Sequence, residues 1–246
     1  MTQRDTNTFP YWTPDGERVM YLSVRKGGGC SIDWKRADGS GESESLPQSE
    51  ETGEWLWPGS WSPDGETLVY LRVLRSQAEH LPNIWIASRD GEPEPRMFVA
   101  TAVPESGPVI SPDGEWLAYV SRESGRWEIY VQPFPDGGER HQISIEGGHS
   151  PVWSPDGQVI YYRNGYQFLA VPVTTKPRFR PGTAKVLFEG QYAIGTYLGF
   201  SNFDIAPDGK SFVMIKADEE WGRATEVRVV LNWFEELERL APTSGN

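Results

Sequence analysis

Cysteine and histidine are scarce in this chain of 246 residues, which has one Cys and three His. The single thiol, Cys30, cannot form a disulfide within the chain, and we expect a packed or idle thiol rather than a nucleophile. The chain has no His-Glu-x-x-His, Cys-x-x-Cys or Gly-x-Ser-x-Gly pattern, which are the motifs of zinc sites and hydrolase nucleophiles. We therefore expect no metal site, no cofactor and no catalytic residue of these kinds.

Long apolar runs and an excess of positive charge are also lacking. No segment reaches the roughly 18 apolar residues of a membrane span, and the first residues lack the apolar stretch of a secretion signal. Lys and Arg number 23 against 35 Asp and Glu, a formal net charge of −12. This balance argues against binding to nucleic acid or to an anionic membrane. Acidic residues such as Glu42 are expected on a solvated face.

One short phrase, by contrast, occurs five times. It is Thr13-Pro14-Asp15-Gly16 in the first copy, Ser-Pro-Asp-Gly from positions 62, 111 and 154, and Ala-Pro-Asp-Gly from position 206. The copies lie 49, 49, 43 and 52 residues apart, and a short apolar run follows each. A period of about 40 to 50 residues with short strands is the signature of a β-propeller.

The phrase itself is typical of a hairpin turn between two buried strands. Proline presets φ for the first central position, Asp tolerates the next, and Gly supplies the positive φ that other residues resist. The five Asp residues could instead be catalytic or metal-binding, but repeated turn chemistry explains them better. We therefore expect these five Asp residues to stabilise turns of the scaffold.

Each unit continues with a third strand and usually a fourth, so the sequence predicts an all-β fold. This fold is a single propeller of five blades, mostly four-stranded and antiparallel, over residues 1–231. The repeats cover about 8–48, 58–100, 107–146, 150–190 and 200–231. The last repeat has three strands and is followed by a short helix over 232–241, which we expect to dock on the propeller flank, a partner-binding helix being the alternative. Either the last blade is three-stranded in a closed ring, or a longer parent protein supplies further strands. An open ring would self-associate through its edges.

The repeat resembles that of TolB-type propellers, most clearly in residues 151–157 (PVWSPDG) and 128–135 (EIYVQPFP). Residues 203–215 and 229–237 resemble the C-terminal end of propeller regions attached to bacterial serine/threonine protein kinases. The resemblance implies a sensory or interaction module. It also implies a periplasmic or extracytoplasmic location as part of a membrane kinase, and a cytoplasmic one otherwise. TolB-type propellers commonly have six blades, whereas five phrases occur here, and the chain has no kinase signature.

The loops expected at the channel mouth, opposite the turns, are 52–58, 102–108, 146–150 and 192–201. They offer a set of aromatic and polar residues for binding a protein, a peptide or a carbohydrate: Trp55, Trp57, Glu105, His149, Tyr192 and Tyr197. Trp55 and Trp57 could alternatively be packed between blades, as we expect of Trp12, Trp61 and Trp153.

A glycoside-hydrolysing propeller is the enzymatic alternative. It would need two carboxylates about 5–5.5 Å or ~6.5–9.5 Å apart in the channel. The candidates are Asp204, on an innermost strand, and Glu105, on a loop that leads into one. The sequence does not decide whether they approach each other.

Overall fold

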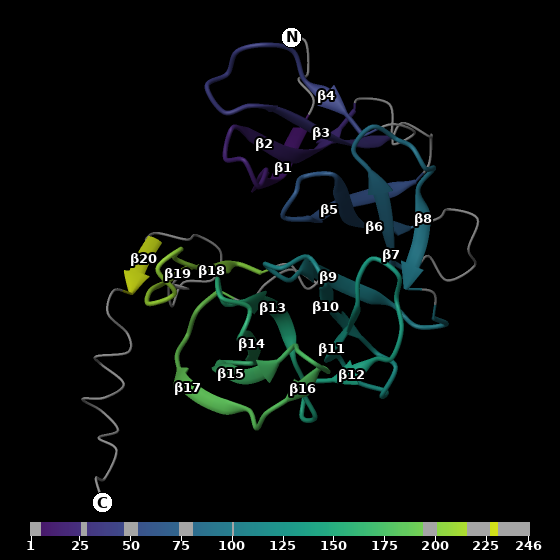
Figure 1. Ribbon diagram of the computed structural model, residues 1–246. Helices are drawn as coiled ribbons and strands as arrows, with labels where there is room; N and C mark the ends of the chain where they lie inside the picture. The colour runs from purple at the N-terminus through teal and green to yellow at the C-terminus, as the bar shows by residue number, and fades with distance from the viewer. Residues whose placement is uncertain are drawn as a thin grey trace, which may run out of the picture.

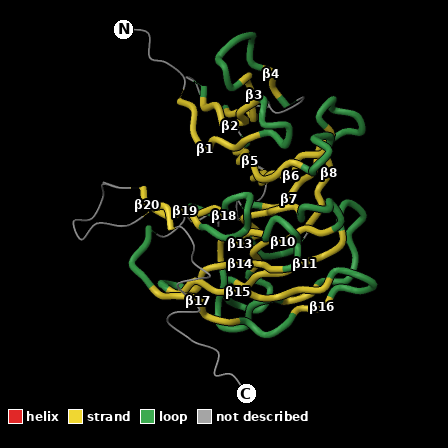
Figure 2. Tube along the Cα trace, turned by 60° about the vertical axis from the view of Figure 1, so that its left-hand side comes forward, coloured by secondary structure: helices red, strands yellow, loops and turns green. Residues whose placement is uncertain are grey.

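The chain folds into five antiparallel sheets that follow one another around an arc, a β-propeller (Figure 1). The computed structural model describes residues 6–25, 29–46, 54–73, 81–99, 101–193, 201–215 and 227–230. Strands and loops make up this part of the chain, without a helix (Figure 2). No helix that could span a membrane is therefore found in these residues. The helix predicted over 232–241 lies outside them.

The first three sheets each have four strands in sequence order from the axis outwards. The first sheet comprises β1 (Thr6–Trp12), β2 (Arg18–Val24), β3 (Cys30–Arg36) and β4 (Glu44–Ser45). The second comprises β5 (Trp55–Trp61), β6 (Thr67–Val73), β7 (Asn83–Ser88) and β8 (Arg96–Val99). The third comprises β9 (Glu105–Ile110), β10 (Trp116–Ser121), β11 (Glu128–Pro133) and β12 (His141–Gln142).

The last two sheets depart from this plan. The fourth comprises β13 (His149–Trp153), β14 (Val159–Asn164), β15 (Gln167–Thr174), β16 (Arg180–Pro181) and β17 (Lys185–Glu189). Its outer edge is shared by two short strands, because β16 and β17 pair with different parts of β15. The fifth has β18 (Phe203–Ile205), β19 (Phe212–Ile215) and β20 (Val227–Val230). The sheets confirm the predicted all-β propeller, and the described residues of the last sheet form three strands; β16 was not predicted.

The repeated phrase forms the turn between the first and second strands of every sheet. In the third sheet, Ser111 Oγ donates a hydrogen bond to Asp113 Oδ1 and accepts one from the Trp116 backbone N–H at 3.0 Å. Asp113 Oδ1 also accepts from the Glu115 backbone N–H, and Gly114 has φ 76°. The first, second and fourth turns repeat these bonds. The Asp side chains therefore hold turns, as predicted.

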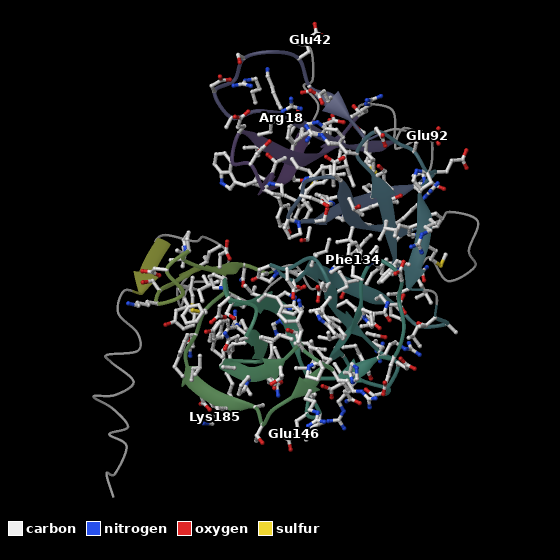
Figure 3. The ribbon with its side chains drawn as sticks, viewed as in Figure 1. Arg18, Glu42, Glu92, Phe134, Glu146 and Lys185 are labelled. Atoms are coloured by element: carbon white, nitrogen blue, oxygen red, sulfur yellow. The ribbon has the colours of Figure 1, made fainter. Side chains whose placement is uncertain are left out.

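Alternation along the second strand of each sheet builds the core between sheets. Leu68 and Tyr70 face the first sheet, whereas Val69 and Leu71 face the third. Such alternation is what a period of two residues produces in a strand buried on both faces. Equivalent clusters join the third sheet to the fourth and the fourth to the fifth. Phe134, labelled in Figure 3, belongs to the cluster between the second and third sheets.

Charged side chains lie around this core. Glu42, Glu92 and Glu146 are exposed and point outwards from the periphery (Figure 3). This agrees with the expected solvated acidic face. Cys30 is the first residue of β3 and is buried, where its Sγ accepts a hydrogen bond from the Leu56 backbone N–H at 3.2 Å. A packed thiol was expected, and this is what the structure has.

Candidate functional site

One position of each repeat faces a cavity on the propeller axis. It is the residue two places before the Ser, Thr or Ala of the turn phrase, and we call it the channel position. Its occupants are Tyr11, Ser60, Val109, Val152 and Asp204. All five line one cavity of about 560 Å³. The innermost strands of all five sheets thus meet at one space.

A β-bulge precedes the channel position in the first, second and fourth sheets, and the β9–β10 pair of the third sheet has a similar irregularity. Phe9, Gly107 and Ser150 lie two residues before it and have φ values of 54°, 55° and 57°. Bulges of this kind bend a strand and re-aim the side chains that follow. In the second sheet the strand passes so close to β6 that a Cβ on Gly59 would lie 2.5 Å from the Val69 carbonyl oxygen. The bulged strands therefore direct the channel positions towards the axis.

The cavity wall is mostly apolar and carries one charged side chain among the described residues, Asp204. This carboxylate is open to the cavity, yet the surrounding protein atoms raise its pKa by desolvation, against a hydrogen bond at 2.8 Å from the Ile205 backbone N–H. Burial raises the pKa of Tyr11 as well, and the negative charge of Asp204 raises it further. The two groups from the first and last sheets are thus electrostatic neighbours.

Two other side chains of the wall have buried polar atoms without a partner among the described residues. They are the Asn202 Oδ1 acceptor and the Trp61 Nε1 donor. The Asn202 Nδ2 group donates to the Ala193 carbonyl oxygen, which fixes the orientation of its amide. A buried polar group without a partner is costly. Because both atoms are buried, neither is directly open to the cavity.

The residue that follows the channel position packs between sheets, and we call its place the contact position. Trp61, Ile110 and Trp153 occupy it in buried clusters with the preceding sheet. Trp12 occupies it in the first sheet, where 64% of its side chain is exposed. The expectation that Trp12 packs between blades is therefore wrong. No preceding sheet covers β1 in the described residues, and Trp12 lines the open cavity instead.

The outward face of the last sheet matches this exposed first strand. Phe212 and Met214 of β19 are buried against the fourth sheet. Val213 and Ile215 alternate with them, are only partly buried, and line the same cavity as Trp12. The first and last sheets thus border the cavity with faces that are buried in the other sheets.

The predicted mouth residues lie at the opposite ends of the innermost strands from the turns. Trp55, Glu105 and His149 are the first residues of β5, β9 and β13, so they lie on strands rather than on the loops predicted. Trp55 is 52% exposed and stacks on Trp57 with ring centroids 6.1 Å apart. Trp57 is partly buried against the clusters on both faces of the second sheet. Of the two alternatives, exposure therefore applies to Trp55 and packing to Trp57.

Glu105 and His149 are more enclosed than an exposed binding residue would be. Glu105 is fully buried; Thr101 Oγ1 donates to its Oε1, and its Oε2 has no partner among the described residues. Burial raises the pKa of Glu105 to about 7. Burial and the nearby charge of Arg163 lower the pKa of His149 to about 4, and its Nδ1 lies 3.1 Å from Ser150 Oγ. Glu105 is therefore mostly protonated and uncharged below pH 7, and His149 is uncharged at neutral pH.

The remaining two mouth residues come from the segment before β18. Tyr192 is partly buried and meets Phe188 edge to face, with ring centroids 5.8 Å apart. Its carbonyl oxygen accepts a hydrogen bond from the buried guanidinium of Arg163, which also bonds the Ala193 and Gly165 carbonyls. Tyr197 lies outside the described residues.

The structure does not bring the two candidate carboxylates together. Asp204 lines the cavity, whereas Glu105 is buried away from it, with Arg140 and Glu123 as its charged neighbours. The described residues also contain no group of three or more His, Cys, Asp or Glu side chains suited to a metal ion. The arrangement supplies a binding cavity rather than a paired-carboxylate site.

The cavity residues Tyr11, Trp12 and Asn202 were not predicted from the sequence. A signal for part of the cavity was present, because the channel position has a fixed offset from each turn phrase. The offset could be recognised only by assigning the phase of each strand, which the bulges shift. None of the five predicted mouth residues that the structure describes, Trp55, Trp57, Glu105, His149 and Tyr192, lines the cavity.

The fold and the cavity thus define a β-propeller with a ligand-sized axial site. No protein-family model matches the chain. Over 79 residues, 32% of its length, the chain is 42% identical to the Tol-Pal system protein TolB of Thioalkalivibrio sulfidiphilus. It is 37% identical to that of Alkalilimnicola ehrlichii over the same number of residues. The aligned part covers 18% of each relative.

Solved structures agree on the architecture. TolB from Acinetobacter baumannii aligns with 89% of this chain at a TM-score of 0.64 and 19% identity. The aligned part is 51% of that protein, so the chain spans about half its length. An oligogalacturonate lyase in complex with manganese aligns with 96% of this chain and 64% of its own, at a TM-score of 0.61 and 14% identity. These likenesses establish a TolB-like propeller fold.

Proposed function

We propose that this chain is a non-catalytic interaction module that binds a protein or peptide along the propeller axis. The observation that carries the proposal is the cavity of about 560 Å³, to which the innermost strands of all five sheets contribute. Its size falls within the range of about 300–1,000 Å³ that is usual for ligand sites, and its mostly apolar wall has a few polar groups, as such sites do. The short match to TolB supports an interaction role.

The mouth end of the channel adds an aromatic contact. Trp55 presents half of its surface to solvent, and one face of its ring stacks on Trp57. An exposed tryptophan has few rotatable bonds to immobilise on binding and is common among residues that dominate interface energetics. We propose that Tyr192, Tyr197, Glu105 and His149 also contribute to binding at this mouth.

Selection of peptides from a display library on the purified full chain tests the proposal. A selected peptide is then synthesised, and its Kd is measured by calorimetry against the wild type, Trp55→Ala and Val186→Ala. Val186, on the outer strand β17, is 47% exposed and serves as an exposed apolar control away from the innermost strands. We expect Trp55→Ala to weaken binding at least tenfold and Val186→Ala to leave it unchanged. Failure to enrich any peptide, or equal effects of the two variants, would contradict the proposal.

Carbohydrate binding is the second candidate function. The Trp55–Trp57 stack favours it, because a flat exposed indole suits the face of a sugar ring. A hydrolytic version would need two carboxylates about the channel, whereas the described cavity wall has one. A glycan array probed with the wild type and with Trp55→Ala tests this candidate. Binding of a glycan that disappears in the variant supports it, and an array without binding removes it.

The module is further proposed to be the sensory part of a bacterial signalling kinase. The support is the resemblance of residues 203–215 and 229–237 to propeller regions of such kinases. Sequencing the reading frame around the gene tests this origin. An adjoining kinase and membrane span support it, and their absence contradicts the origin without affecting the interaction proposal.

A further inference from the structure

We propose that the axial cavity recognises a positively charged group, the guanidinium or ammonium of an Arg or Lys side chain, through Asp204 with the rings of Tyr11 and Trp12 beside it. The inference rests on the proposed function, because it takes the ligand to be a side chain of a bound peptide. It adds the chemistry by which the cavity selects among peptides.

The charge of the wall is the first argument. Asp204 is the one charged side chain among the described residues that line the cavity. Its described partner is the Ile205 backbone N–H, and no described Lys or Arg forms an ion pair with it. Desolvation raises its pKa, which is the behaviour of a carboxylate that lacks a compensating cation. A bound cation would supply that compensation.

The aromatic groups supply the second argument. Trp12 lines the cavity with 64% of its side chain exposed, and Tyr11 is close enough for its pKa to be affected by Asp204. A cation beside a carboxylate and over an indole face gains from both, and Arg is favoured because its plane stacks on rings. The other described residues of the wall are uncharged, so none of them repels a cation.

Selectivity among simple probes tests the cavity without a peptide. The full chain is titrated with butylguanidinium, with its neutral analogue butylurea and with pentanoate, and binding is followed by the indole N–H resonances. We expect butylguanidinium to bind the wild type at least tenfold more tightly than butylurea, and pentanoate most weakly. Equal affinity for the cation and its neutral analogue would overturn the inference. So would the absence of binding when the cation is at millimolar concentration and in 50-fold excess over the protein.

Two variants locate the effect. Asp204→Asn keeps the shape of the side chain and should reduce the preference for the cation to below about twofold. Asp208→Asn, four residues away on the exposed turn of the same sheet, is the control and should retain the full preference. Trp12→Ala should weaken butylguanidinium more than butylurea, because the cation loses its attraction to the indole face in addition to the ring surface that both probes contact. A preference that survives in Asp204→Asn would contradict the assignment.

The outcome separates this inference from the proposed function. A selected peptide that binds the wild type and Asp204→Asn equally well would overturn the inference and leave the interaction module standing. Selective binding of butylguanidinium without any enriched peptide would support the cation site and contradict the peptide proposal.

Discussion

Replacement of Glu105 by Gln is expected to change how the stability of the protein depends on pH. Glu105 is fully buried at the start of β9, and one of its carboxylate oxygens has no partner among the described residues. Burial raises its pKa to about 7 from an ordinary value of 4.5. The carboxyl is therefore protonated in the folded chain at pH values where the unfolded chain has already lost the proton. Glu105→Gln keeps the shape and stays neutral throughout.

The sign and the size of the change in unfolding free energy follow from this difference between the folded and unfolded pKa values. Between pH 4.5 and 7 the folded state binds more protons than the unfolded state, so the free energy of unfolding falls as pH rises. The gap between the two pKa values corresponds to roughly 3 kcal/mol, at about 1.4 kcal/mol for each pKa unit. We expect wild type to lose about this much relative to Glu105→Gln between pH 4.5 and pH 7.5.

Urea denaturation followed by tryptophan fluorescence measures the effect. The quantity to compare is the difference in unfolding free energy between wild type and Glu105→Gln at each pH, because groups common to both proteins then cancel. Glu42→Gln, at an exposed site on the periphery, is the matched control and should follow the wild type. A difference between wild type and Glu105→Gln that is the same at pH 4.5 and pH 7.5 would refute the reasoning.

Three further outcomes are expected. Trp61→Ala should lower the free energy of unfolding, measured by urea denaturation, by about 3–5 kcal/mol, because Trp61 is buried edge to face against Trp34. Trp12→Ala, at the same repeat position, should lower it by only about 0.5 kcal/mol. Equal losses would contradict the assignment of contact positions. The pKa of His149 is lowered by burial, so wild type should lose stability relative to His149→Gln as pH falls from 6.5 to 4, and a parallel pair of pH profiles would be the contrary result. Light scattering over a dilution series should show weak self-association that Trp12→Glu reduces, and a variant that associates as the wild type does would show that the exposed first strand is not involved.

The sheets could be predicted because their signals are local. Each turn phrase contains its own hydrogen-bond donors and acceptors, as the bonds around Ser111 and Asp113 show, so its structure depends little on the rest of the chain. The strands beside it follow from their apolar pattern. The two-residue strand β16 has no such signal, because Arg180 and Pro181 are both exposed.

The axial cavity could not be predicted in the same way. Trp12 has the local sequence of Trp61 and Trp153, and its exposure depends on whether a neighbouring sheet covers it. The sequence places Asp204 on an innermost strand, but its electrostatic effect on Tyr11 requires the first and last sheets to border the same space. The bulges add a further obstacle, since they change the face on which later side chains point.

The adjacency of the channel and contact positions has a consequence for how such a protein can diverge. Neighbouring residues of one strand serve two separate tasks, one setting the chemistry of the axial wall and the other joining the sheets. The five channel positions hold Tyr, Ser, Val, Val and Asp, so each sheet contributes one side chain to the chemistry of the axial wall. A single codon change at a channel position can exchange the group that faces the cavity, while the next residue, Trp61, Ile110 or Trp153 in the second to fourth sheets, keeps its packing. Descendants of one ancestral propeller can thereby acquire new ligands through substitutions at these five positions, with the scaffold unchanged.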